Sequence, residues 1–298
     1  MPYFVIEGNR RAIPFPSMPG VSRLSVDHLL KEVKEARALG IKSVLLFGVP
    51  APKYKDHAGS YAYSEAGIVP RAVAALKKAV KGITVITDVC LCAYTNHGHC
   101  GVINKGSKAI NHKATLAALS AVALSHAQAG ADWVAPSAMA KKQIMAIREA
   151  LDKNGYIKIR ILGYSAKFVS NFYGPFREAA DSAPKFGDRR AYQLDYAKGN
   201  AALKEIAVDI KEGADMVMVK PALSYLDIIR EVKDEFHFPL AAYNVSGEYA
   251  FVKYGAKKGW WDEKGLVGEI IASIKRAGAD KIISYHAKDI ARWLKEED

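Results

Sequence analysis

All three cysteines of the sequence lie within residues 90–100. An odd number of cysteines argues against a disulfide framework, whereas three thiolates can bind Zn²⁺ and leave its fourth coordination position open, as catalytic zinc requires. Alternate residues of a strand face the same way, so Asp88, Cys90 and Cys92 would point to one side, with Cys100 joining them from the following loop. The segment therefore predicts a catalytic zinc site, with buried free cysteines as the alternative.

Two histidines, His97 and His99, lie between the second and third cysteines. Either ring could coordinate a metal, since imidazole is a common zinc ligand. Each is next to Gly98, which makes the pair equally suited to shaping the loop around the site.

Two lysines follow apolar runs. Lys167 comes after residues 159–166, and Lys220 comes after residues 216–219. A lysine that closes an apolar strand is partly desolvated, which lowers its pKa, and a second nearby cation lowers it further. The neutral amine can attack a ketone and form a Schiff base. For either lysine alone the alternative is a side chain that extends to solvent, but a pair on neighbouring strands favours the chemical role.

Arginines stand among aromatic residues in segments 172–177 and 185–190, which follow Lys167. Because arginine binds carboxylates through two parallel hydrogen bonds, this loop suggests a keto acid held by its carboxylate while its carbonyl meets the amine. Ser246 and Tyr285, at the ends of later strands, could hold a second carboxylate. Ordinary loop polarity is the alternative for each of these residues taken singly.

The elements that must position these side chains follow a regular alternation. Short β-branched runs alternate about eight times with amphipathic stretches of helical length, which is typical of strands joined by crossover helices. The pattern predicts an α/β protein with one (β/α)8 TIM barrel domain over residues 1–298. An open doubly wound sheet is disfavoured because no G-x-G-x-x-G follows the first strand. The expected strands are 3–7, 43–48, 84–92, 133–137, 158–165, 216–220, 239–246 and 281–286, and the expected helices are 26–38, 69–80, 113–129, 141–154, 201–212, 226–236, 266–277 and 288–297.

Three helix-to-strand turns share the sequence Gly-Ala-Asp, at residues 130–132, 213–215 and 278–280. Glycine suits the left-handed position after a helix. These turns lie at the end of the barrel opposite the loops that carry chemistry, so we interpret them as scaffold. The long loops 50–68 and 171–199 are the expected carriers of function.

The chain is basic, with 43 Lys and Arg against 31 Asp and Glu and a formal net charge of +12. This balance fits a lysine-rich surface or a polyanionic partner. No zinc-finger, helix-turn-helix or RNP pattern supports nucleic-acid binding. No apolar run reaches the roughly 20 residues that span a bilayer, and the first residues do not form a secretory signal. We therefore expect a cytoplasmic protein with neither a nucleic-acid nor a membrane partner.

With these residues, the sequence closely resembles the porphobilinogen synthase family, also called 5-aminolevulinate dehydratases, over nearly its whole length. The resemblance is strongest in residues 88–101, 164–190, 218–227 and 243–249. It implies a hydro-lyase that condenses two 5-aminolevulinate molecules to porphobilinogen, with loss of two waters, in tetrapyrrole (haem) biosynthesis. The nearest rival is a Schiff-base aldolase on the same barrel, which needs neither a second lysine nor zinc. A basic nucleic-acid-binding protein with structural zinc is the non-enzyme alternative.

The resemblance also implies roles for single residues. Lys220 matches the lysine that holds the first substrate molecule as a Schiff base. Lys167, Asp88 and Ser137 match residues of the second substrate's site, with Lys167 forming a second imine or acting as acid or base, and Asp88 assisting proton transfer. The ligands of the family's zinc-using branch match Cys90, Cys92 and Cys100.

The carboxylate-binding residues of the family match as well. Arg177 and Arg189 correspond to the arginines of the second substrate's site, and Ser246 and Tyr285 to the hydroxyls of the first. Glu205 falls where some members bind an allosteric Mg²⁺, so Mg²⁺ is a second candidate cofactor.

Two departures from the family pattern stand out. The family has a longer N-terminal arm that wraps a neighbouring subunit, so the very short arm here predicts a homo-oligomer smaller than the usual octamer. Around Ser137 the family usually reads Ser-Asp-Met-Met-Asp-Gly, and this chain has Ala138, Lys141 and Lys142 where the pattern has its two acidic residues and its glycine.

Overall fold

The computed structural model describes residues 1–104 and 106–297. The strands are β1 (Pro2–Val5), β2 (Ala12–Pro14), β3 (Ser22–Leu24), β4 (Ser43–Gly48), β5 (Thr84–Val89), β6 (Trp133–Pro136), β7 (Arg160–Lys167), β8 (Met216–Lys220), β9 (Leu240–Asn244) and β10 (Lys281–Ser284). The α-helices are α1 (Val26–Ala38), α2 (Ile68–Ala79), α3 (His112–Gln128), α4 (Gln143–Lys153), α5 (Gly174–Ala179), α6 (Gly199–Lys211), α7 (Leu226–Phe236), α8 (Ser246–Lys257), α9 (Glu263–Ala277) and α10 (Ala287–Glu297). The 3-10 helices are η1 (Pro52–Tyr54), η2 (Ser60–Tyr63), η3 (Asn171–Tyr173) and η4 (Leu223–Tyr225).

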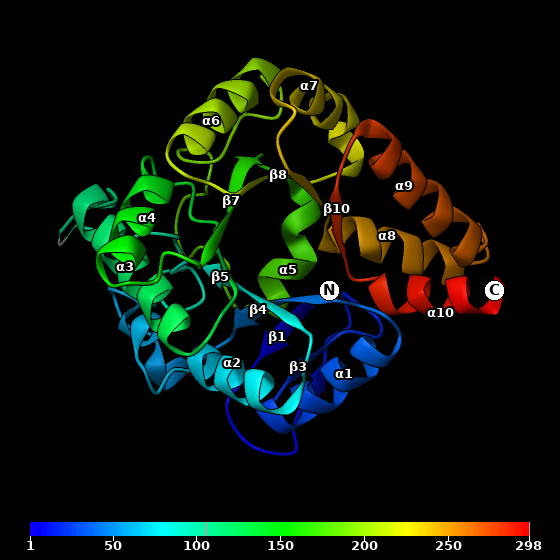
Figure 1. Ribbon diagram of the computed structural model, residues 1–298, viewed down its shortest axis with the longest axis horizontal. Helices are drawn as coiled ribbons and strands as arrows, with labels where there is room; N and C mark the ends of the chain where they lie inside the picture. Colours follow the sequence, from blue (N-terminus) through cyan, green and yellow to red (C-terminus); the bar gives the residue numbers. More distant parts are fainter. Residues whose placement is uncertain (105, 298) are drawn as a thin grey trace.

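The strands of the described chain pair in the order β10-β9-β8-β7-β6-β5-β4-β1-β3-β2. From β1 through β4 to β10, neighbours are parallel and follow chain order. Helices surround these strands on the outside (Figure 1). The expected (β/α)8 barrel architecture is therefore confirmed.

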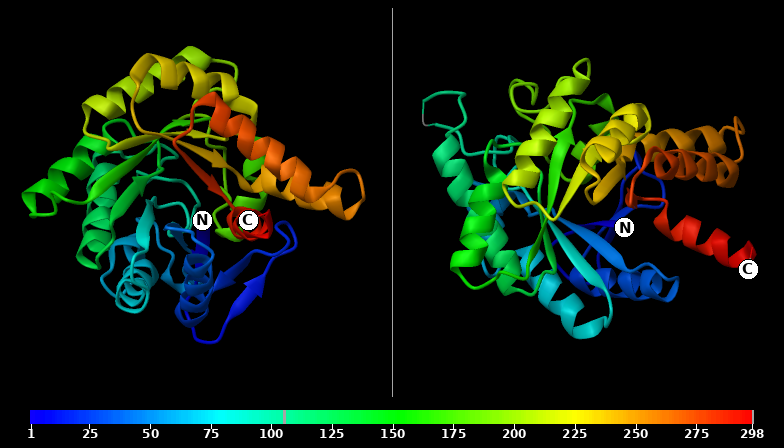
Figure 2. Two further views of the ribbon diagram at one scale, coloured as in Figure 1. Left: turned by 45° about the vertical axis from the view of Figure 1, so that its right-hand side comes forward. Right: turned by 45° about the horizontal axis from the view of Figure 1, so that its top comes forward.

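The barrel has a seam between its first and last strands. The second hydrogen-bonded neighbour of β1 is β3, and β2 pairs antiparallel with β3, so β10 and β1 stand apart in the strand order. The sequence did not predict β2 and β3, because three-residue strands containing Pro, Ser and Arg show no apolar alternation. Helix α10 extends from the end of β10 beside this seam (Figure 2).

The barrel strands are apolar because both of their faces are covered, as expected for parallel sheets. Along β4, Leu45 and Phe47 join the hydrophobic cluster that also holds Phe4 of β1, while Val44 and Leu46 join a cluster with α1 and α2. The alternation of strand side chains thus separates the barrel interior from the layer under the helices.

The Gly-Ala-Asp turns are scaffold, as predicted. Their glycines have φ values of 97°, 99° and 123°, which glycine adopts without steric cost. Each aspartate immediately precedes a strand and accepts a hydrogen bond from a backbone N–H at the start of the preceding strand. These bonds are Asp132 with Val85 (2.8 Å), Asp215 with Ile161 (2.8 Å) and Asp280 with Leu240 (2.9 Å).

Several predicted boundaries were wrong near the ends of the strands. Strand β5 stops at Val89, before the first two cysteines, whereas β7 continues to Lys167. The range 239–246 combined β9 with the first residue of α8, because the apolar run continues through Val245 into that helix. Helices α5 and α8 were not predicted. Among the described residues, no helix is both long and apolar enough to cross a membrane.

The aspartate turns generate a prediction about stability. Replacing Asp215 by alanine removes the acceptor for the Ile161 N–H and should lower the free energy of unfolding by about 1–2 kcal/mol. Denaturant unfolding followed by circular dichroism measures this change. Asp215→Asn keeps an oxygen acceptor and should lose less. Equal losses in the two variants would mean that the hydrogen bond is not what the turn contributes.

Candidate active site

Lys220 is the last residue of β8 and is 4% exposed. Its Nζ lies 4.2 Å from the ring centre of Tyr243 and 5.0–5.3 Å from those of Tyr164, Phe176 and Tyr173. Burial, together with the positive charge of Lys167, lowers the pKa of Lys220 to about 7. The side chain is therefore an amine that is largely uncharged just above neutral pH, as the sequence predicted.

Lys167 is the last residue of β7 and pairs in register with Lys220 of β8. Its Nζ donates a 2.6 Å hydrogen bond to the carbonyl oxygen of Ser137, which follows β6. Asp88 of β5 lies near both lysines. Burial raises the pKa of Asp88 to about 6, although Ser137 and the two lysines pull it down. One carboxylate oxygen of Asp88 is buried without a hydrogen-bond partner in the described part of the chain. Four neighbouring strands thus bring two amines and a carboxyl group together, as the sequence predicted.

The cysteines converge just beyond β5. Cys90, Cys92 and Cys100 are buried and not disulfide-bonded, and their sulfur atoms lie within 4.8 Å of one another, close enough to bind one metal ion. The reasoning from strand alternation was wrong, because a turn beginning at Leu91 follows the strand. The Sγ atoms of Cys90 and Cys92 nevertheless lie 3.5 Å apart. Hydrogen bonds from the other two thiols, aided by Arg189, lower the pKa of Cys100 and favour its thiolate.

The two histidines shape the neighbouring loop. His99 makes ring contacts with the carbonyl oxygen of Phe186 (2.9 Å) and the hydroxyl of Tyr192 (3.2 Å). His97 contacts the carbonyl oxygen of His57 through Nε2 and accepts a hydrogen bond from the His99 N–H through Nδ1. Because the ring nitrogens already have these partners, the loop-shaping alternative explains both residues.

The two predicted arginines differ in how firmly they are held. Arg189 is 6% exposed, and its Nη2 donates to the carbonyl oxygens of Gly98 and Ser182. Arg177, on α5, makes one long contact of 3.5 Å to Ser170. Among the described residues, the Nε atoms of both arginines and both amide atoms of buried Gln193 lack partners. Buried polar groups are normally hydrogen-bonded, so the unpaired N–H groups of the arginines and of the Gln193 amide are suited to binding an anionic ligand.

The predicted hydroxyls lie at the ends of the last two strands. Ser246 is buried at the start of α8, where its Oγ donates to the Phe172 carbonyl oxygen (3.1 Å) and accepts from the Phe176 N–H (3.0 Å). Its hydroxyl therefore fastens the segment over the site rather than standing free. Tyr285 follows β10 and accepts a 3.2 Å hydrogen bond from the Tyr243 hydroxyl, which connects it to the surroundings of Lys220.

Glu205 lies on α6 rather than at a strand end. It lines a cavity of about 660 Å³ together with Cys100 and Ala138, and a smaller one of about 300 Å³ together with Lys141 and Lys142. The structure thus brings the other predicted site residues to one end of the barrel, and Glu205 shares a cavity with one of them, Cys100.

Residues 1–293 match the family model described as delta-aminolevulinic acid dehydratase. The chain belongs to the delta-aminolevulinic acid dehydratase family. A curated dehydratase from Synechocystis is 53% identical over 297 residues, which is 99% of this chain and 90% of the relative. One from Archaeoglobus fulgidus is 50% identical over 98% of this chain and 89% of the relative.

A solved structure agrees with this assignment. The dehydratase (porphobilinogen synthase) of Toxoplasma gondii ME49, in complex with the reaction product porphobilinogen, is 44% identical and superimposes with a TM-score of 0.98. The match covers 100% of this chain and 84% of that one. As a member of the delta-aminolevulinic acid dehydratase family, the protein is a hydro-lyase that makes porphobilinogen in tetrapyrrole biosynthesis.

Five residues of this dehydratase site were not predicted from the sequence. They are the aromatic residues around Lys220 and the unpaired amide in the arginine loop: Tyr164, Tyr173, Phe176, Tyr243 and Gln193. The sequence showed Tyr164 and Tyr243 inside barrel strands and the others inside the long loop after Lys167. Only that location on a barrel strand and its loop could have indicated them.

The pKa of Lys220 predicts a pH profile for imine formation. Levulinic acid, which has the keto acid skeleton without the amine, should be trapped on Lys220 by cyanoborohydride at a rate that rises with pH and levels off above about 7. The rise follows the neutral amine, because the protonated form cannot attack a ketone. Mass spectrometry of the Lys220 peptide measures the rate. A profile still rising steeply at pH 9 would show that Lys220 keeps the ordinary lysine pKa of about 10.4.

Proposed function

We propose that the chain condenses two 5-aminolevulinate molecules with Lys220 and Lys167 as its two reactive amines. The observation that carries the proposal is the pairing of these residues at adjacent strand ends, beside the cysteine cluster. A Schiff-base aldolase needs only one such amine and no cysteine-bound metal, and the family assignment favours the dehydratase.

Lys220 acts as the nucleophile toward the first substrate molecule. Its neutral amine attacks the ketone carbon, and loss of water gives an imine, which is a better electrophile than the ketone. The surrounding rings of Tyr164, Tyr173, Phe176 and Tyr243 support this role, because they exclude the water that would hydrolyse the imine. Lys167 holds the second molecule as an imine, or serves as its acid or base.

Asp88 moves protons between the reacting groups. A carboxyl group whose pKa is about 6 can both accept and release a proton near neutral pH. One buried carboxylate oxygen of Asp88 supports this role, since no residue of the described chain donates a hydrogen bond to it. The carbonyl oxygen of Ser137 orients the amine of Lys167 toward Asp88 by accepting its hydrogen bond.

The carboxylates of the two substrates are bound by different residues. Arg177 and Arg189 receive one, which is supported by their unpaired Nε atoms. Tyr285 and Ser246 receive the other, near Lys220. Ser246 supports this assignment less directly, because its hydroxyl already fastens segment 172–176.

The metal of the site is Zn²⁺, bound by Cys90, Cys92 and Cys100. Three buried cysteines, of which Cys100 favours the thiolate form, fit zinc. Zinc binds well to sulfur ligands and keeps a fourth position open in catalytic sites. When bound, zinc supplies Lewis acidity toward the second substrate molecule.

Mg²⁺ at Glu205 stays a prediction of the family resemblance. The cavity that Glu205 lines also holds the carboxyl groups of Asp209 and Glu212, together with the ammonium groups of Lys141 and Lys142. A homo-oligomer, a cytoplasmic location and a single catalytic domain over residues 1–298 stay predictions of the family resemblance and the sequence. The side chains available for self-association include the exposed Phe251, Tyr254 and Trp260.

The assignment of the first imine to Lys220 is tested by trapping. Borohydride added with 5-aminolevulinate should attach the substrate to Lys220 in the wild-type protein, and Lys220→Ala should abolish both this adduct and porphobilinogen formation. Peptide mass spectrometry and the colorimetric porphobilinogen assay measure the two effects. The matched control is Lys233→Ala, on α7. Full trapping in Lys220→Ala would assign the essential imine to another residue.

The metal site is tested by metal content. Cys92→Ala leaves two thiolates, so zinc bound after dialysis should fall to background, because structural and catalytic zinc sites use at least three protein ligands. Elemental analysis measures the metal, with Ser125→Ala on α3 as the control. Unchanged zinc in Cys92→Ala would place the metal elsewhere.

A further inference from the structure

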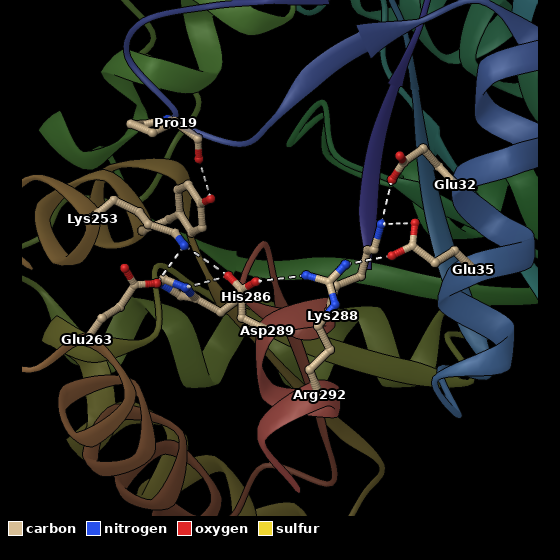
Figure 3. A network of polar contacts seen from close by, with 10 residues as sticks. Pro19, Glu32, Glu35, Lys253, Glu263, His286, Lys288, Asp289 and Arg292 are labelled. Atoms are coloured by element: carbon tan, nitrogen blue, oxygen red, sulfur yellow. Dashed lines mark hydrogen bonds and ion pairs between the residues drawn. The ribbon is translucent and has the colours of Figure 1, made fainter. Parts of the chain in front are cut away.

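Helix α10 is joined to α1 across the seam of the barrel. Lys288 lies 2.8 Å from Glu32 and 2.7 Å from Glu35, and Arg292 lies 2.6 Å from the other oxygen of Glu35 (Figure 3). One turn further along, the Nζ of Lys295 donates to the carbonyl oxygen of Ala38 at the end of α1. These cations are spaced at i, i+4 and i+7, so they share one face of α10.

The same helix is joined to α8 and α9 through Asp289. The Nζ of Lys253 lies 3.0 Å from Asp289 and 2.5 Å from Glu263, and Arg292 lies 3.6 Å from the second oxygen of Asp289. Although burial raises the pKa of Asp289, its neighbours His286 and Lys253 lower it to about 2, so the group stays charged. We call the set Glu32, Glu35, Lys253, Glu263, Lys288, Asp289 and Arg292 the seam clasp.

The seam clasp is not a metal site. The ligand atoms of Glu263, His286 and Asp289 lie within 4.8 Å of one another, which is close enough for a cation. The ammonium group of Lys253 already contacts both carboxylates, so the chain supplies the cation itself. The interactions therefore join elements rather than bind an ion.

The seam clasp lies next to the predicted substrate site. Tyr285 and His286 are the two residues between β10 and α10. The ring of Tyr285 stacks on Phe4 of β1 at 6.2 Å and lies 5.7 Å from Tyr249 of α8, which also packs on His286. The Tyr249 hydroxyl donates to the carbonyl oxygen of Pro19, so it connects α8 to the segment before β3. A shift of α10 would move Tyr285 with it.

We propose that the seam clasp positions Tyr285 for the substrate carboxylate by closing the barrel where β10 and β1 do not pair. The inference rests on the role proposed above for Tyr285. A binding hydroxyl must be held to within about 0.5 Å of its working position. Strand pairing on both edges fixes the ends of the other barrel strands. At β10, pairing with β9 holds one edge, and ion pairs between the first and last helices hold the other side. Lys288 and Glu35 are positioning residues, since neither lies in the site.

The proposal predicts a change in KM rather than kcat. Lys288→Met removes the charge and keeps much of the side-chain volume, so KM for 5-aminolevulinate should rise about tenfold while kcat falls less than threefold, the pattern of lost substrate binding. Lys288→Arg should restore KM. Glu35→Gln weakens the same contacts from α1 and should show the same pattern, which tests the proposal separately if Lys288→Met folds poorly.

The matched control is Lys233→Met, which breaks a comparable ion pair. Lys233 lies 2.8 Å from Asp280, at the opposite end of β10 from Tyr285. Its removal should leave KM unchanged. An equal rise in KM in both variants would mean that the seam clasp stabilises the fold without positioning Tyr285, and would overturn the proposal.

A double variant shows whether the effect passes through Tyr285. Groups that act through one another give non-additive changes, so Lys288→Met combined with Tyr285→Phe should have the KM of Tyr285→Phe alone. Additive increases would overturn the proposed route. Borohydride trapping in the wild type keeps the two hypotheses apart. Absence of an adduct on Lys220 contradicts the proposed function, whereas trapping with an unchanged KM in Lys288→Met contradicts only the seam clasp.

Discussion

The amine of Lys220 has lost nearly all contact with water, and the arrangement of the site depends on that loss. A buried ammonium group without an ion-pair partner is costly, so burial favours the neutral amine. The four rings around it come from β7, η3, α5 and β9. Two of them, Tyr173 and Phe176, belong to the segment that Ser246 fastens to the start of α8. The contacts that cover the site are therefore the same contacts that make its nucleophile reactive.

Opposite charges in the site are divided between its two sides. The lysines stand at the ends of β7 and β8, while Asp88 and the cysteine cluster stand at and beyond the end of β5. Like charges within each group shift the pKa values in useful directions: Lys167 lowers that of Lys220, and Cys100 raises that of Asp88. One carboxyl group and one amine thus titrate within the range where an enzyme exchanges protons near neutral pH. These groups meet because consecutive strands of a barrel are adjacent, so residues at the ends of consecutive strands lie side by side in the site.

The parts of this arrangement that depend on strand order could be predicted from the sequence. Strands covered on both faces are continuous apolar runs, and a residue closing such a run lies at the functional end of a barrel. Lys167 and Lys220 were found by that rule, whereas Asp88 was found through its alternation with Cys90 and Cys92. Gln193 and Phe176 were not predicted. Gln193 lies in an irregular segment, and Phe176 lies in α5, whose six residues are too few for a periodicity to indicate direction or burial. The closeness of Cys90 and Cys92 was predicted from an extended strand, yet a turn brings the sulfur atoms together.

The seam could not be foreseen either, since a repeating strand and helix pattern predicts a closed circle of hydrogen bonds. Here β3 occupies the edge of β1 that a closed barrel would give to the last strand. Backbone hydrogen bonds require strands about 4.8 Å apart, whereas lysine and arginine side chains connect helices whose backbones are much farther apart. The circle is therefore completed in the helix layer, through Lys288 and Arg292, at the helix that directly follows Tyr285. The position of Tyr285, which the last strand end presents to the substrate, therefore depends on the contact between the first and last helices.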